Sequence, residues 1–75
     1  MLIEVTQADI DDGKRGQCYY CPIALAASRA FGEECYVTGI GLFVGRKEYE
    51  LPPAASQFVF LFDGGWTVQP FSFTV

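Results

Sequence analysis

Hydrophobic and polar residues alternate near both ends of the chain. Ile3 and Val5 stand on either side of Glu4, and the last six residues repeat the pattern in the sequence PFSFTV. Alternation with a period of two is typical of a β-strand with one buried face. It predicts strands near residues 2–5 and 70–75, and we expect these terminal strands to pair in one sheet.

Two further extended segments lie in the middle of the chain, near residues 35–44 and 47–51. Within the first segment, Gly39 and Gly41 predict a bulge or a bend, because glycine inside a strand weakens a flat ladder. Gly45 then stands at the first central position expected for a type II′ turn. We therefore expect the two strands to be joined as a hairpin.

The sequence CYYCPIALAASRAFG, which begins at Cys18, carries the strongest helix signals. Cys21 stands at the N-cap position and Pro22 at the first helical position, where the missing N–H of proline costs nothing. Gly32 ends the pattern, so we predict a helix near residues 22–31. The apolar stripe that we expect to face the core consists of Ile23, Ala27, Ala30 and Phe31.

Two more helices are predicted from similar signals. Thr6 and Asp9 resemble a capping box that starts a short helix near residues 7–12, and we expect Gly13 to end it in a left-handed conformation. A longer helix is predicted near residues 53–63. Its expected core stripe consists of Ala55, Phe58, Val59 and Phe62.

These elements predict an α+β fold in a single domain covering residues 1–75. The expected architecture is a small antiparallel or mixed sheet with the helices packed on one face. The chain contains seven Phe, four Tyr and one Trp among only 75 residues. A core of this size does not hide all of these rings, so we expect exposed apolar surface that meets a partner or a second copy of the chain in a homodimer.

The charge of the chain narrows the class of partner. Nine acidic residues against five basic ones give a formal net charge of −4. Because nucleic-acid binding depends on Lys and Arg displacing counterions, we expect no direct nucleic-acid partner. The opening MLIEVTQADI shows neither a signal-peptide pattern nor a long apolar run, and the three cysteines are an odd number. We therefore expect a cytoplasmic protein without membrane contact.

The cysteines are the sharpest chemical feature. Cys18 and Cys21 form a Cys-x-x-Cys pair at a helix start, where the helix dipole favours a thiolate. Together with Cys35 they offer three zinc ligands, so Glu33 or Glu34 would have to supply the fourth. Redox pairs of the thioredoxin type follow a strand in a βαβ unit, which is not the context here. We expect the thiols mainly to fill space, and a thiol or zinc-binding protein is the alternative hypothesis.

Catalytic constellations are missing from the sequence. The chain has no histidine, so its serines lack the usual general base. None of the glycines is followed by the Lys-Ser/Thr and helix of a phosphate-binding loop. We therefore predict a protein that has no enzymatic activity and needs no cofactor.

The candidate binding residues are acidic or aromatic. Acidic side chains suit a basic partner surface, and the candidates are Asp9, Asp11, Asp12, Glu33 and Glu34. Phe60 lies off the core stripe of its helix, so we expect it to be exposed. Aromatic residues are enriched at binding hot spots, and the candidates are Tyr19, Tyr20, Phe60 and Trp66.

Two motifs lie near the ends of the chain: V-T-x-x-D-I-x-x-G-x-x-G-x-C-x-x-C-P-I-A-L-A, which begins at Val5, and the ending F-D-G-G followed by V-Q-P-F-S-F-T-V. In these motifs the chain resembles small bacteriophage and prophage proteins that have no assigned activity. The resemblance does not extend to residues 35–55. The resemblance implies a virus-encoded accessory protein in the bacterial cytoplasm, and no catalytic residue can be carried over from it.

The function predicted from these features is inhibition of a host factor by binding. Small acidic phage proteins without enzymatic activity often block host defence, so an anti-CRISPR role against a CRISPR effector is the most specific version of this prediction. The anti-CRISPR role is inferred by analogy, from the small size of the protein and its resemblance to phage proteins. The acidic candidates would then occupy a basic channel meant for nucleic acid.

Overall fold

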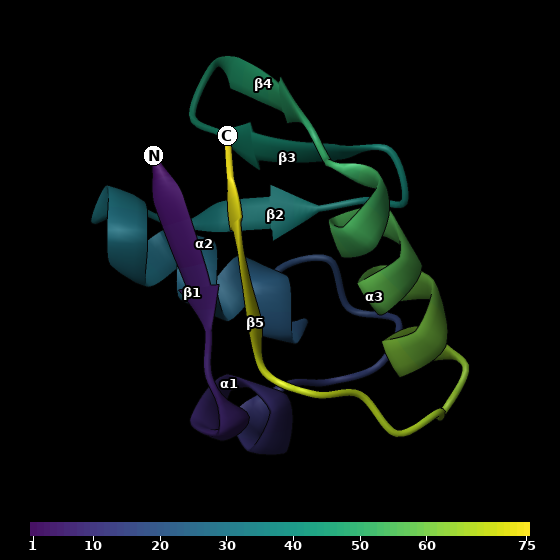
Figure 1. Cartoon of the computed structure of the whole chain (residues 1–75). Helices are drawn as coiled ribbons and strands as arrows, with labels where there is room; N and C mark the ends of the chain where they lie inside the picture. Colours follow the sequence, from purple (N-terminus) through teal and green to yellow (C-terminus); the bar gives the residue numbers. More distant parts are fainter.

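The computed structural model describes all 75 residues as an α+β protein. The strands are β1 (Leu2–Val5), β2 (Cys35–Val37), β3 (Gly41–Val44), β4 (Lys47–Glu50) and β5 (Phe71–Thr74). The helices are α1 (Gln7–Asp12), α2 (Pro22–Phe31) and α3 (Pro53–Asp63). The predicted fold class and the three predicted helix ranges are confirmed (Figure 1).

The strands form two antiparallel sheets, whereas the sequence predicted one. β1 pairs with β5, so the two ends of the chain lie together as expected, and the Met1 ammonium group donates to the Val75 carbonyl at 2.7 Å. The second sheet has the order β2-β3-β4. α2 packs against both β1 and β2, so a shared helix joins the sheets without a continuous hydrogen-bond ladder (Figure 1).

The segment predicted as one bent strand, residues 35–44, is two strands joined by a tight turn. The Thr38 N–H donates to the Gly41 carbonyl at 2.9 Å. The Thr38 hydroxyl accepts from the N–H groups of Ile40 at 3.4 Å and Gly41 at 3.2 Å. The threonine therefore stabilises a complete reversal of the chain, and β2 pairs with β3 instead of continuing into it.

Two other turns test the predictions made from glycine. Gly45 has a φ of +59° and Arg46 a negative φ, which is the sign pattern of the predicted type II′ turn between β3 and β4. Gly13 is extended, with φ −67° and ψ 154°, so the predicted left-handed end of α1 is wrong. Glycine is needed there for space, because a Cβ would lie 2.7 Å from the ring of Pro22.

Helix α2 packs against α1, β1 and β2 and has the predicted ends. Cys21 is its N-cap, and Gly32 follows its last residue in the left-handed conformation. Because β1 and β2 both pack on this helix, its buried face is wider than the predicted stripe and includes Ala24 and Ala26. Ala30 is exposed, contrary to the prediction, because it lines an open depression beside Leu2 and Glu4 of β1 and does not face the core.

Helix α3 closes the core on the opposite side. Its predicted apolar stripe is buried in full, and the ring of Phe58 stacks on that of Phe71 in β5 with centroids 4.8 Å apart. Seventeen buried hydrophobic residues from both sheets, α2, α3 and the adjoining segments form one continuous cluster. The outer face of α3 remains uncovered by any other element (Figure 1).

Candidate binding surface

A groove runs along the outer face of α3 beside the turn between β2 and β3. It has a volume of about 540 Å³ and is lined by Gly39, Ser56, Val59, Phe60, Asp63, Gly64 and Trp66. We call it the α3 groove. Its lining includes two exposed aromatic side chains and one carboxylate but no basic residue.

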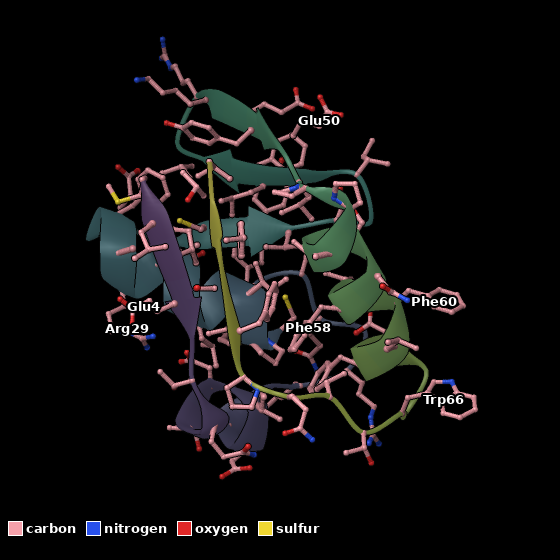
Figure 2. The ribbon with its side chains drawn as sticks, viewed as in Figure 1. Glu4, Arg29, Glu50, Phe58, Phe60 and Trp66 are labelled. Atoms are coloured by element: carbon pink, nitrogen blue, oxygen red, sulfur yellow. The ribbon has the colours of Figure 1, made fainter.

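Helix geometry explains why Phe60 lines the groove while its neighbours are buried. Two residues correspond to about 200° of rotation around an α-helix. Phe58 and Phe62 therefore point into the core, and Phe60 points away from it. Phe60 is 73% exposed, as the sequence predicted, and Figure 2 shows its ring projecting from α3 away from the sheets. An exposed ring of this size, when grouped with others, is typical of an interaction surface.

Trp66 is held at the groove by the way in which α3 ends. Gly65 has a φ of +84°, and its N–H donates to the Phe62 carbonyl at 3.1 Å. The Trp66 N–H donates to the Leu61 carbonyl at 2.9 Å. These two bonds form a Schellman motif, which fixes the direction in which the chain leaves the helix. The indole lies over Gly64, where a Cβ would be 3.2 Å from the ring, and it is 67% exposed (Figure 2).

Asp63 supplies the only charge in the lining of the α3 groove. Its Oδ1 accepts the N–H of Gly16 at 3.0 Å, which ties the loop after α1 to the end of α3. Asp63 is the last residue of α3, whose final turn carries no basic residue. The one ion pair in the structure joins Arg29 to Asp9. The Asp63 carboxylate therefore has no cationic partner within the chain.

A smaller pocket of about 240 Å³ adjoins the α3 groove and shares three lining residues with it, among them Asp63. Cys18, which is exposed, and Cys21, which is buried, also line it. The Cys21 sulfur accepts the N–H of Ala24 at 3.4 Å as the cap of α2. Burial raises the pKa of the Cys21 thiol, and the nearby Asp63 charge adds to the rise. The thiolate that the helix dipole favours is therefore not the stable form of Cys21.

Cys35 is fully buried in β2. Its thiol donates to the Glu33 carbonyl at 3.4 Å, and burial raises the pKa of this thiol as well. Nowhere do three His, Cys, Asp or Glu side chains come together in an arrangement suited to a metal ion. The three cysteines and a neighbouring glutamate thus do not assemble into the zinc ligand set considered as the alternative.

Asp9 does not belong to an exposed acidic surface, and this corrects the sequence interpretation. It is 4% exposed and is the only buried charged residue. Its Oδ1 and Oδ2 accept from the Arg29 guanidinium at 2.8 and 2.9 Å, and Oδ2 also accepts the Thr6 N–H at 2.9 Å in the predicted capping box. The hydrogen bond from Arg29, followed by those from Thr6, lowers the pKa of the Asp9 carboxyl. Asp9 therefore joins α1 to α2 and is not available to a partner.

The other four acidic candidates are exposed, but they do not form one patch. Asp11 and Asp12 lie on α1, which ends beside Pro22 at the start of α2. Glu33 and Glu34 follow the opposite end of α2. A helix of ten residues is about 15 Å long, so the two pairs are well separated. None of the four lines the α3 groove.

The two tyrosine candidates also lie outside the groove and make contacts within the chain. The Tyr19 ring packs on Tyr36 with centroids 5.3 Å apart, and Tyr36 stacks on Phe43 across β2 and β3 at 4.6 Å. The Lys14 ammonium lies 5.8 Å from the centroid of the Tyr20 ring. The predicted aromatic candidates thus divide into the pair that lines the α3 groove and two partly exposed tyrosines elsewhere.

Sequence reasoning missed two residues at this surface. Asp63 stands three positions after Phe60, and this spacing places both residues on one side of a helix. The sequence therefore contained enough information to group Asp63 with Phe60. Ile40 is 77% exposed at the tip of the turn whose Gly39 lines the groove. Nothing in the sequence indicates that this turn lies beside α3, because the two segments meet only through tertiary packing.

The longest helix, α3, has eleven residues, and no helix is long and apolar enough to cross a membrane. Comparison of the chain with protein-family models, with curated proteins and with solved structures finds no match.

Proposed function

We propose that this protein is a non-enzymatic binding protein that engages a host protein through the α3 groove and blocks it. The observation that carries the proposal is the exposure of Phe60 and Trp66 on the lining of one groove. The backbone of both residues is held by regular structure, that of Phe60 by α3 and that of Trp66 by the Schellman motif. Only the side-chain rotamers then have to be ordered when a partner covers the rings, and an aromatic side chain has only two rotatable bonds.

The two rings offer enough apolar area to anchor a complex. An aromatic side chain buries roughly 150–250 Å² when it is enclosed, and apolar burial contributes about 25 cal/mol per Å². Covering the exposed part of each ring then contributes about 3 kcal/mol. Anchors of this kind commonly dominate the binding energy of a protein interface.

The resemblance of both chain ends to phage proteins supports a partner in the bacterial cytoplasm. The net charge of −4 supports a partner with a basic surface. A CRISPR effector, whose nucleic-acid channel is basic, is the narrowest form of the proposal. In that form Asp63, and not the predicted Asp9, lies next to the apolar anchors.

Affinity capture from a lysate of the bacterial host tests the proposal. We expect the wild-type protein to retain a host protein in stoichiometric amount, and we expect the double variant Phe60→Ser/Trp66→Ser to lose it. Tyr20→Ser, which changes an exposed ring outside the groove, is the matched control and should retain the partner. Capture that survives the double variant, or no captured host protein at all, would refute the proposal. Sedimentation over a range of concentrations would show whether a second copy is the partner instead.

A further inference from the structure

We propose that the α3 groove binds a lysine or arginine side chain of the partner protein, with the cation at Asp63 and the alkyl stem against Phe60 and Trp66. The inference rests on the proposed function and deepens it, because it names the chemistry of the group that anchors the partner. A charged carboxylate, two aromatic rings and the absence of any basic lining residue all occur in this one groove.

The bond that the Asp63 side chain makes within the chain does not require a charge. It comes from the N–H of Gly16, and the amide oxygen of an asparagine would also accept it, although a carboxylate accepts it more strongly. A negative charge at the C-terminal end of a helix opposes the helix dipole. No basic residue in the last turn of α3 compensates for it. A cation that arrives from outside would stabilise a carboxylate at such a position.

Arg15 is a cation of the chain that lies beside this end of α3. Its guanidinium carbon is 3.8 Å from where a Cβ on Gly65 would lie, and Arg15 lines an adjoining depression that shares Trp66 with the α3 groove. Arg15 forms no ion pair with Asp63 and does not line the α3 groove. The carboxylate in the groove is therefore open to the cation of a partner.

Lysine and arginine match both the apolar and the charged parts of the groove. Their stems are apolar and pack along hydrophobic surface while the charged head reaches a polar group. Aromatic rings also attract a cation placed over their faces, and tryptophan does so most strongly. A purely apolar side chain would cover Phe60 and Trp66 but would leave the Asp63 carboxylate desolvated without a partner.

A set of four peptides tests the inference. They share the sequence acetyl-Ser-Leu-Xaa-Leu-Ser-amide and carry arginine, lysine, norleucine or glutamate at the central position. Trp66 is the only tryptophan of the chain and lines the α3 groove, so a change in the tryptophan fluorescence comes from this ring. We expect the arginine and lysine peptides to bind about fivefold or more tightly than the norleucine peptide, and the glutamate peptide to bind least. Added salt should weaken only the first two.

Two variants make the test specific. Asp63→Asn retains an acceptor for the Gly16 N–H and should reduce the preference for arginine and lysine over norleucine to the part that the two aromatic rings supply. Glu50→Gln removes an exposed charge from β4, at the other end of the molecule from Trp66 (Figure 2), and should leave the preference unchanged. Equal binding of the norleucine and arginine peptides, a preference that is undiminished in Asp63→Asn, or no spectral change with any peptide would overturn the inference. A host protein that is still captured through Phe60 and Trp66 would then leave the proposed function standing.

Discussion

Replacing Asp9 with asparagine removes the only buried charge while keeping the shape of the side chain. The asparagine oxygen can still accept the Thr6 N–H of the capping box. In the wild type, the Arg29 guanidinium donates two hydrogen bonds of 2.8 and 2.9 Å to the Asp9 carboxylate, and the substitution removes this charged acceptor. The substitution therefore isolates the ionic link between α1 and α2 from the helix cap.

The expected loss of stability follows from the geometry of this pair. Removing a hydrogen bond to a charged group from a folded protein lowers the free energy of unfolding by about 1.5–3 kcal/mol. The Arg29 side chain is 55% exposed, so water solvates much of it once the carboxylate is gone. The lower end of the range applies, and we expect Asp9→Asn to lower the free energy of unfolding by about 1.5 kcal/mol. Asp11→Asn changes an exposed carboxylate on the same helix and should cost less than about 0.5 kcal/mol.

Urea unfolding between pH 2 and pH 7 measures how much stability Asp9 contributes and whether that contribution rises or falls with pH. The pKa of Asp9 is lowered in the folded state, so its stabilising contribution is complete above the unfolded value of about 3.9. The contribution is lost as the pH falls through the lower, folded pKa. The difference between the wild type and Asp9→Asn should therefore be largest at neutral pH and shrink below pH 4. A difference that is absent at pH 7, or that stays constant down to pH 2, would refute the structural role of Asp9.

Three further predictions follow from burial and backbone geometry. Phe58→Ala should lower the free energy of unfolding by about 3–4 kcal/mol, because it leaves a cavity where Phe58 stacks on Phe71 of β5. In the same urea experiment, Phe60→Ala should change the free energy of unfolding by less than about 0.5 kcal/mol, because Phe60 is exposed. Gly65→Ala should cost about 1–2 kcal/mol, because an L-residue is strained at a φ of +84°, and thermal unfolding measures this loss. Cys18 should react with iodoacetamide in the native protein, and the two buried cysteines should react only after unfolding; mass spectrometry of labelled peptides distinguishes these outcomes.

The helices could be predicted from the sequence because their signals are local. Cys21, Pro22 and Gly32 mark both ends of α2 within a few residues of each other, and the capping box marks the start of α1. The buried stripe of α3 follows from its periodicity alone, and so does the exposure of Phe60. These features depend on chain geometry that neighbouring residues determine.

The division into two sheets and the location of the groove depend on contacts between distant residues. The turn at Thr38 separates two strands through a side-chain hydrogen bond that the glycine pattern only hinted at. Asp9 looked exposed because its partner Arg29 is 20 positions away in the sequence. The proximity of Gly39 to α3, which makes Asp63 part of a groove, is likewise a consequence of tertiary packing.

Photocrosslinking in bacterial host cells tests most directly whether the α3 groove is the binding surface. Benzoylphenylalanine introduced at position 60 keeps an aromatic ring on the groove, and the same residue at position 20 places one outside it. We predict that irradiation joins the position 60 protein to one host protein and that the position 20 protein gives no such product. No adduct from position 60, or the same adduct from both positions, would contradict binding through this groove.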